Sequence, residues 1–592
     1  YNPDGLMALQ DGSFTADEKQ QLAAILNAWD PIFNKFREKP ADFDAFFQRF
    51  GPYMKSAEMQ WPNLTGDLLA ETAKELKDSA GSLDQWRPEE LRALAHWAPG
   101  LYTSLAQILR QVEETGQWPC ALHHGYTTLI PKPGMNAAPS PQELRPISVL
   151  SAVYRLWSKT RFSTAIQWQE NWSHTQLWGC RPKRGAEAMT MDIAMELEAD
   201  AYNECHVVGG VSYDFKKAFD LIPVPYMIEA LKRRGAHRNL TAALEGMYAS
   251  LQRVFRLRGA CSEFWSAANG ILQGCSLSMV GLNAIVGVMP EISQEVLECT
   301  TVRTYADDIS AVAQASTRTE LQDRIRKFHA VVRAYQDADG GTISVSKSFT
   351  FGDKCLKGVL DQDFGHLESF RLVGGSLTVR EKAPSMTHLE TQRLDKWHGT
   401  ITKLRYAPIP WRSTSKMLLA TQTQAFWGQG THSMAADVSR LKKIRSDIMR
   451  TMFKCDFYSF SPPMTFSLLL PPQLDPLFGP VYHGLRTIAR FLRRQGFAEI
   501  LRRRLLMLPS GPRKGKDGPT KRMRDLLGTT FAPLVRELID ENSQQLNEQE
   551  WAHRLRAHWR EFLWSKAAKD RPQHYAWLCT RSMKFWPTLK IG

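Results

Sequence analysis

The fold is decided by the stretch TVRTYADDISAV, residues 301–312. Apolar and β-prone residues stand on both sides of two adjacent carboxylates, Asp307 and Asp308. This pattern predicts two strands joined by a tight turn, a hairpin with carboxylates at its tip. A second β-prone run, residues 207–213, ends in Asp214, and we expect a strand that holds a third carboxylate at its edge.

Three carboxylates at strand edges favour a metal site, although a lone Asp-Asp pair is more often a solvated turn. Each acidic site here borders an apolar run that would hold it rigidly, and the chain is basic, so composition does not explain the cluster. Convergent carboxylates bind hard divalent cations through oxygen. Two such ions about 3.5–4 Å apart can support a phosphoryl transfer. Metal binding would offset the repulsion between the carboxylates.

Composition indicates a globular protein with a polyanionic partner. The chain has 592 residues, 43% hydrophobic and 23% charged, which excludes wholesale disorder. Its formal net charge of +14 favours a polyanion. Nine cysteines without a CxxC pair fit neither a disulfide scaffold nor a zinc ribbon. The longest apolar run, residues 279–290, is shorter than the ~20 residues of a membrane span, so we expect none. Because the chain begins at Tyr1, we expect a fragment or processed product.

Hydrophobic periodicity predicts helices over much of the remaining chain. The clearest are at 88–114, with a break at Pro99 and Gly100, and at 147–168, 321–335 and 404–453.

Eight blocks in order resemble the motifs of reverse transcriptases, most closely those of non-LTR (LINE-type) retrotransposons. YADD at 305–308 resembles the metal-binding hairpin of the family, and DFKKAFD at 214–220 resembles its first catalytic motif. ILQGCSLS at 271–278 resembles the Gln-Gly motif between them. The other blocks are LIPKPG at 129–134, LRPIS at 144–148, WGCRP at 178–182, SVSKSF at 344–349 and LVGG at 372–375. Cys180 stands where the family usually has Phe.

The resemblance implies an RNA-directed DNA polymerase that extends a primer 3′-hydroxyl on an RNA template. The partners would be RNA template, DNA primer or target, and dNTPs, without a membrane, in a nuclear or cytoplasmic ribonucleoprotein. The implied fold is an α+β right-hand polymerase with fingers, an antiparallel palm sheet, a thumb and a helical C-terminal extension. The expected domains are an N-terminal helical segment (1–73), fingers and palm (74–380), a thumb-like region (381–480) and a basic C-terminal region (481–592).

The same resemblance assigns the metal site. Asp214, Asp307 and Asp308 would be catalytic and would coordinate two Mg²⁺ ions, with Mn²⁺ as the alternative metal. Phe215, the neighbour of Asp214, joins the metal-binding set.

The resemblance also assigns nucleotide contacts. These are Lys132 and Arg145 at the triphosphate, Phe219 beside the sugar, Gln273 and Gly274 at the nucleotide and its templating base, and Lys347 as a general acid. A ring fixed against the sugar at Phe219 would leave no room for a 2′-hydroxyl. The structural alternatives are a core phenylalanine, a helix-turn glycine, and solvated loop or surface charges.

Much of the net charge lies between residues 486 and 524. This stretch contains thirteen basic and two acidic residues, which gives it a net charge of +11. Apolar residues interleave with these charges, which predicts amphipathic basic helices suited to holding a phosphate backbone. The expected nucleic-acid contacts are Arg493, Arg494, Arg502, Arg503 and Arg504. The alternatives are a solvated basic face or a localisation signal.

Three other functions fit parts of the pattern. A group II intron-type maturase with reverse transcriptase activity would have intron RNA as its partner. An RNA-dependent RNA polymerase is disfavoured by the bulky Phe219. A decayed element that only binds nucleic acid is disfavoured by the intact acidic triad.

Overall fold

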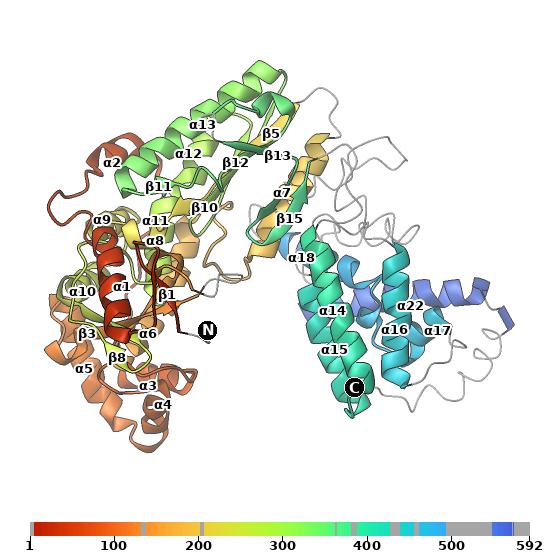
Figure 1. Ribbon diagram of the computed structural model, residues 1–592, viewed down its shortest axis with the longest axis horizontal. Helices are drawn as coiled ribbons and strands as arrows, with labels where there is room; N and C mark the ends of the chain where they lie inside the picture. Colours follow the sequence, from red (N-terminus) through yellow and green to blue (C-terminus); the bar gives the residue numbers. More distant parts are fainter. Residues whose placement is uncertain are drawn as a thin grey trace.

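The computed structural model describes residues 5–131, 138–201, 207–360, 364–379, 388–426, 438–454, 461–492, 548–570 and 572–573. These residues form an α+β protein in which a five-stranded and a four-stranded sheet are surrounded by helices, with a further helical group beside them (Figure 1).

The first part of the described chain is largely helical. Its helices are α1 (Glu18–Phe33), α2 (Asp44–Phe50), α3 (Gly66–Lys74), α4 (Pro88–Trp97) and α5 (Gly100–Thr115). The predicted break at Pro99 and Gly100 is confirmed. A short hairpin of β1 (Met7–Ala8) and β2 (Phe14–Thr15) precedes α1. The helical prediction for this region missed the hairpin, because two-residue strands carry almost no periodicity.

The four-stranded sheet has the order β4-β3-β7-β8. Its strands are β3 (His124–Ile130), β4 (Arg145–Val149), β7 (Gln252–Leu257) and β8 (Ala260–Cys261). The helix predicted from residue 147 is wrong at its start, because residues 147–149 pair with β3. Helix α6 (Ala152–Trp172) follows, and the Ser151 side chain caps it by accepting from the Val153 amide.

The five-stranded sheet has the order β13-β12-β5-β10-β9. Its strands are β5 (Val207–Tyr213), β9 (Thr300–Tyr305), β10 (Asp308–Ala315), β12 (Phe349–Gly352) and β13 (Gly365–Leu367). The predicted hairpin is β9–β10. The prediction of an antiparallel sheet is wrong at one edge, where β12 and β13 run parallel. Helix α13 (Arg318–Asp339), predicted at 321–335, lies along this sheet (Figure 1).

The main core contains helices that come between these strands in sequence. They are α8 (Ala218–Leu221), α9 (Val224–Arg233), α10 (Arg238–Ser250), α11 (Ser276–Val286) and α12 (Val288–Val296), while α7 (Ala186–Ala201) packs in a second core. Contrary to expectation, the helical stretch Ser276–Val296 is long and apolar enough to cross a membrane. Its most apolar window is 89% buried within the protein, as in the core helix of a globular domain.

The second core joins α7 to the last part of the described chain. A hairpin of β14 (Ser369–Leu372) and β15 (Gly375–Thr378) leads to α14 (His388–Tyr406), α15 (Trp411–Ala425), α16 (Val438–Phe453), α17 (Pro462–Met464), α18 (Gly479–Leu492) and α22 (Glu548–Asp570). These helices stand together at one side of the molecule (Figure 1). The helix predicted at 404–453 is interrupted between α14 and α15, where Pro408 and Pro410 remove two backbone donors.

Candidate active site

A cavity of about 1070 Å³ opens where the ends of β5 and β9 meet the β14–β15 hairpin. Asp214, Asp307 and Asp308 all line it. Its basic lining residues are Arg145, Lys347, Arg371 and Arg393. The cavity therefore combines an acidic floor with cationic side chains from several elements.

Strand register brings the three aspartates together. Ile309 on β10 pairs with Tyr213 on β5, so Asp214 follows its strand beside Asp308. Tyr305 pairs with Asp308 to close the β9–β10 turn, and Ala306 in that turn has a φ of +53°. A left-handed conformation is strained for an alanine and persists only where the surroundings fix it. The predicted acidic hairpin is confirmed.

The pKa values of Asp307 and Asp308 are raised, because both carboxyl groups are buried and lie close to other carboxylates. Burial, followed by the charges of Asp307 and Asp214, raises the pKa of Asp308 to about 7, and Lys347 acts in the opposite direction. Burial also raises the pKa of Asp307, to which Asp214 adds, while Arg145 and Lys347 act in the opposite direction. A bound cation would relieve this repulsion.

The donor chemistry of the aspartates fits a hard divalent cation, because all the ligands would be oxygen atoms. The present side chains do not form a closed cage: within the described ranges, no group of three or more His, Cys, Asp or Glu residues is arranged to hold a metal ion. The Lys347 ammonium instead faces Asp214, with 3.6 Å between Nζ and Oδ1.

The comparison with known proteins concerns the part of the chain that carries this site. Residues 130–357 match the family model described as reverse transcriptase (RNA-dependent DNA polymerase). This part of the chain is similar to a reverse transcriptase domain. The matched range includes all three aspartates, Arg145 and Lys347.

A curated relative narrows the type of reverse transcriptase. The retrovirus-related Pol polyprotein from type-2 retrotransposable element R2DM of Drosophila melanogaster is 27% identical over 356 residues, 58% of this chain. The match spans 30% of the relative's length. The resemblance to non-LTR reverse transcriptases is thus confirmed.

The predicted nucleotide contacts that the structure describes divide into two groups. Arg145, the first residue of β4, and Lys347 line the cavity with the aspartates. Phe219, Gln273 and Gly274 are not among its lining residues. Lys132, Arg493, Arg494, Arg502, Arg503 and Arg504 lie outside the described residues.

The second group is nevertheless held in place by specific contacts. Phe219 is half-buried against the main core. Gln273 donates its side-chain amide to Asp220 Oδ1 at 2.8 Å. Gly274 has a φ of +119°, and a Cβ there would lie 2.9 Å from the Ser148 carbonyl oxygen, so glycine is required. Phe215 buries its ring, and its backbone pairs with Ile343 in the ladder of β6 (Phe215–Lys216) and β11 (Thr342–Ile343). Its metal role stays a prediction.

Sequence reasoning missed the segment that supports the acidic turn at Asp307 and Asp308. The Trp178 amide donates to the Thr304 carbonyl at 2.8 Å. A Cβ on Gly179 would lie 2.6 Å from the Ala306 backbone nitrogen. Both residues belong to the WGCRP block, whose resemblance to the family was recognised without a structural role.

A buried ion-pair network was also missed. Arg303 on β9 is fully buried and contacts Asp192 at 2.5 Å, and it pairs with Glu196, both on α7. The only signal in the sequence was an arginine within an apolar strand. This network ties the strand that leads to Asp307 to helix α7.

Two further arginines of the cavity were missed as well. Arg371 lies on β14 and Arg393 on α14, and both line the cavity. Arg393 donates to the Gly374 carbonyl at 2.9 Å. Their guanidinium groups suit phosphate oxygens.

Proposed function

We propose that the protein is an RNA-directed DNA polymerase that extends a primer 3′-hydroxyl on an RNA template with dNTPs, in retrotransposition. The observation that carries this proposal is the convergence of Asp214, Asp307 and Asp308 in one cavity. The match to reverse transcriptases and the similarity to the R2DM polyprotein support it.

The architecture supports a right-hand polymerase. The five-stranded sheet with α13 would be the palm, and the four-stranded sheet with the preceding helices would be the fingers. Helices α14, α15 and α16 would form the thumb. The proposed limits remain 1–73, 74–380, 381–480 and 481–592.

Asp214, Asp307 and Asp308, with Phe215 beside them, would hold two Mg²⁺ ions, with Mn²⁺ as an alternative. When bound, such ions lower the pKa of an attacking hydroxyl and stabilise a leaving oxygen. The raised pKa values of Asp307 and Asp308 support this role, because they arise first from burial and then from the neighbouring carboxylates, and a bound cation would offset both.

The cations of the cavity would handle the triphosphate. Arg145 and, by resemblance, Lys132 would bind its oxygens. Lys347 would carry the proton that the pyrophosphate takes up, because its ammonium is exposed to the cavity beside Asp214.

Nucleotide selection would rest on the motifs next to the cavity. The half-buried ring of Phe219 would exclude a 2′-hydroxyl, and its neighbour Asp220 orients Gln273. Gly274 would allow close approach of the backbone to the nucleotide and templating base. Arg493, Arg494 and Arg502–Arg504 would hold the nucleic-acid duplex by its phosphates.

Primer extension on RNA and DNA templates tests the proposal. We expect incorporation of dNTPs on the RNA template that depends on a divalent metal. Incorporation of ribonucleotides alone would indicate an RNA polymerase, and binding without any extension would indicate a decayed element. Strong preference for a structured intron RNA would favour the group II intron alternative.

A further inference from the structure

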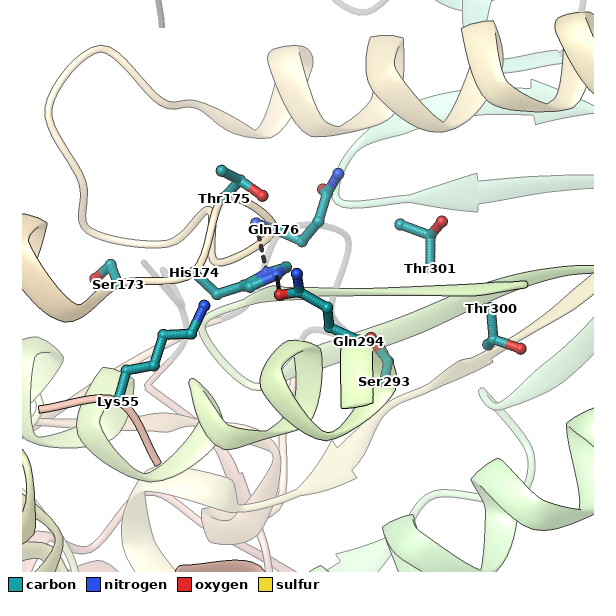
Figure 2. A pocket seen from close by; sticks show the side chains of 9 residues that line it. All are labelled: Lys55, Ser173, His174, Thr175, Gln176, Ser293, Gln294, Thr300 and Thr301. Carbon is teal, nitrogen blue, oxygen red and sulfur yellow. Dashed lines mark hydrogen bonds between the residues drawn. The ribbon is translucent and has the colours of Figure 1, made fainter. Parts of the chain in front are cut away.

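A second cavity, of about 440 Å³, lies away from the aspartates (Figure 2). Its lining comes from the loop after α6, the end of α12, the start of β9 and the segment before α3. The lining residues are Lys55, Ser173, His174, Thr175, Gln176, Ser293, Gln294, Thr300 and Thr301. The only ring among these lining residues is the His174 imidazole, and none of them carries a carboxylate, so a cation is not favoured.

His174 organises one end of this cavity. Its Nδ1 accepts from the Gln176 backbone amide at 3.1 Å, so its Nε2 carries the hydrogen and donates to Gln294 Oε1 at 3.0 Å. Figure 2 shows both contacts. Burial is the main cause that lowers the pKa of His174 to about 4, so the ring is neutral at pH 7.

The acceptors at this end are therefore occupied, and donors remain. Gln294 Oε1 is used by His174, and Gln176 Oε1 accepts from the Trp178 indole at 3.0 Å. Within the described residues, neither side-chain amide nitrogen has a hydrogen-bond partner, nor does the buried Ser173 hydroxyl. The Lys55 ammonium also lines the cavity, and its charge partly opposes the burial that raises the pKa of Glu291 behind the lining. Donors and one positive charge fit a phosphate.

The part of the cavity lined by Thr300 and Thr301, with Ser293 next to Gln294, has the opposite character (Figure 2). The hydroxyl hydrogens are committed elsewhere: Ser293 donates to the Pro290 carbonyl, Thr300 to the Glu298 carbonyl and Thr301 to Glu196. Their oxygen lone pairs remain as acceptors. Glu196 and Glu291 behind the lining already pair with Arg303 and Arg234. Acceptors at this end fit a sugar hydroxyl, which is a donor.

We propose that this cavity binds a ribose–phosphate unit of an RNA strand, with the phosphate at Lys55 and the 2′-hydroxyl at Ser293. The inference rests on the proposed function for its RNA partner. The cavity and the aspartates lie near opposite ends of β9, whose Thr300 and Tyr305 are roughly 17 Å apart at strand spacing. One strand of RNA would therefore contact the protein at a second point, beyond the site of synthesis.

The test is equilibrium binding of short single-stranded RNA and DNA of one sequence, in EDTA so that no synthesis occurs. Lys55→Gln combined with Gln294→Leu should weaken RNA binding roughly tenfold and reduce the magnitude of the salt slope by about 0.7. Lys77→Gln, at an exposed lysine elsewhere, removes the same charge and is the control. Ser293→Ala should weaken RNA binding and leave DNA binding unchanged.

RNA affinity of the double variant equal to that of Lys77→Gln would overturn the proposal. A second result would also overturn the proposal. If inorganic phosphate binds the cavity and RNA binding does not change, the cavity is a site for a free anion only. Equal losses for RNA and DNA in Ser293→Ala would overturn the 2′-hydroxyl assignment. Primer extension by the wild-type protein is measured separately. If it shows no extension while the variants lose RNA binding as expected, the polymerase function is refuted and the RNA-binding site is still supported.

Discussion

Gly179→Ala should slow catalysis without touching a carboxylate. The added Cβ would lie 2.6 Å from the Ala306 backbone nitrogen, whereas ordinary contacts begin at 3.4 Å. The turn that carries Asp307 must therefore shift by about 0.8 Å, because backbone cannot rotate away as a flexible side chain can. A misplacement of about 1 Å at reacting groups can cost roughly 100-fold in rate. We expect a single-turnover rate lower by roughly 30- to 100-fold.

The assay is single-turnover primer extension at saturating primer–template, with duplex binding measured in parallel. Gly185→Ala is the matched control, because a Cβ there meets nothing within 4 Å. Overpacking of this kind also costs about 1–3 kcal/mol of stability, so melting is recorded for both variants. Equal extension rates in the two variants would refute the reasoning that Gly179 sets the position of the acidic turn.

The remaining predictions concern selectivity, metal binding and the nucleic-acid grip. Phe219→Val should raise the ratio of ribonucleotide to deoxynucleotide incorporation, and an unchanged ratio with activity retained would remove Phe219 as the gate. The pKa of about 7 at Asp308 means that metal must displace a proton at lower pH. Apparent Mg²⁺ affinity, measured by calorimetry, should therefore fall as the pH drops below about 7, and Asp308→Asn should flatten this dependence. Replacing Arg502, Arg503 and Arg504 by Gln should reduce the salt slope of duplex binding by about one to two, because adjacent residues on the helix predicted from the sequence would point about 100° apart. An unaltered slope would place the duplex grip elsewhere.

Local patterns made much of the site predictable. The acidic hairpin needs only two β-prone runs and a two-residue turn, and all of these lie within residues 301–312. Asp214 could be added because it ends a strand of its own. The motif resemblance then ordered these pieces along the chain, and the stretch that matches the reverse transcriptase family model, residues 130–357, contains both acidic sites.

Features that depend on distant partners escaped prediction. Gly179 acts through Ala306, and Arg303 through Asp192 and Glu196, so neither role is visible in a short window. Residues 147–149 look helical by periodicity, yet pairing with β3 makes them a strand. The parallel edge of the sheet depends on the path of the chain between β12 and β13, which periodicity does not record.

The central claim is that Asp307 belongs to the catalytic metal site of an RNA-templated DNA polymerase. The most direct measurement is the single-turnover rate of primer extension on RNA by Asp307→Asn, with Asp323→Asn as control. Asp323 lies on α13, and its side chain is 58% exposed. Loss of one preorganised charge of this kind typically costs about 10²–10³ in rate. We predict that loss for Asp307→Asn with wild-type duplex binding, and none for Asp323→Asn; wild-type extension by Asp307→Asn would contradict the account.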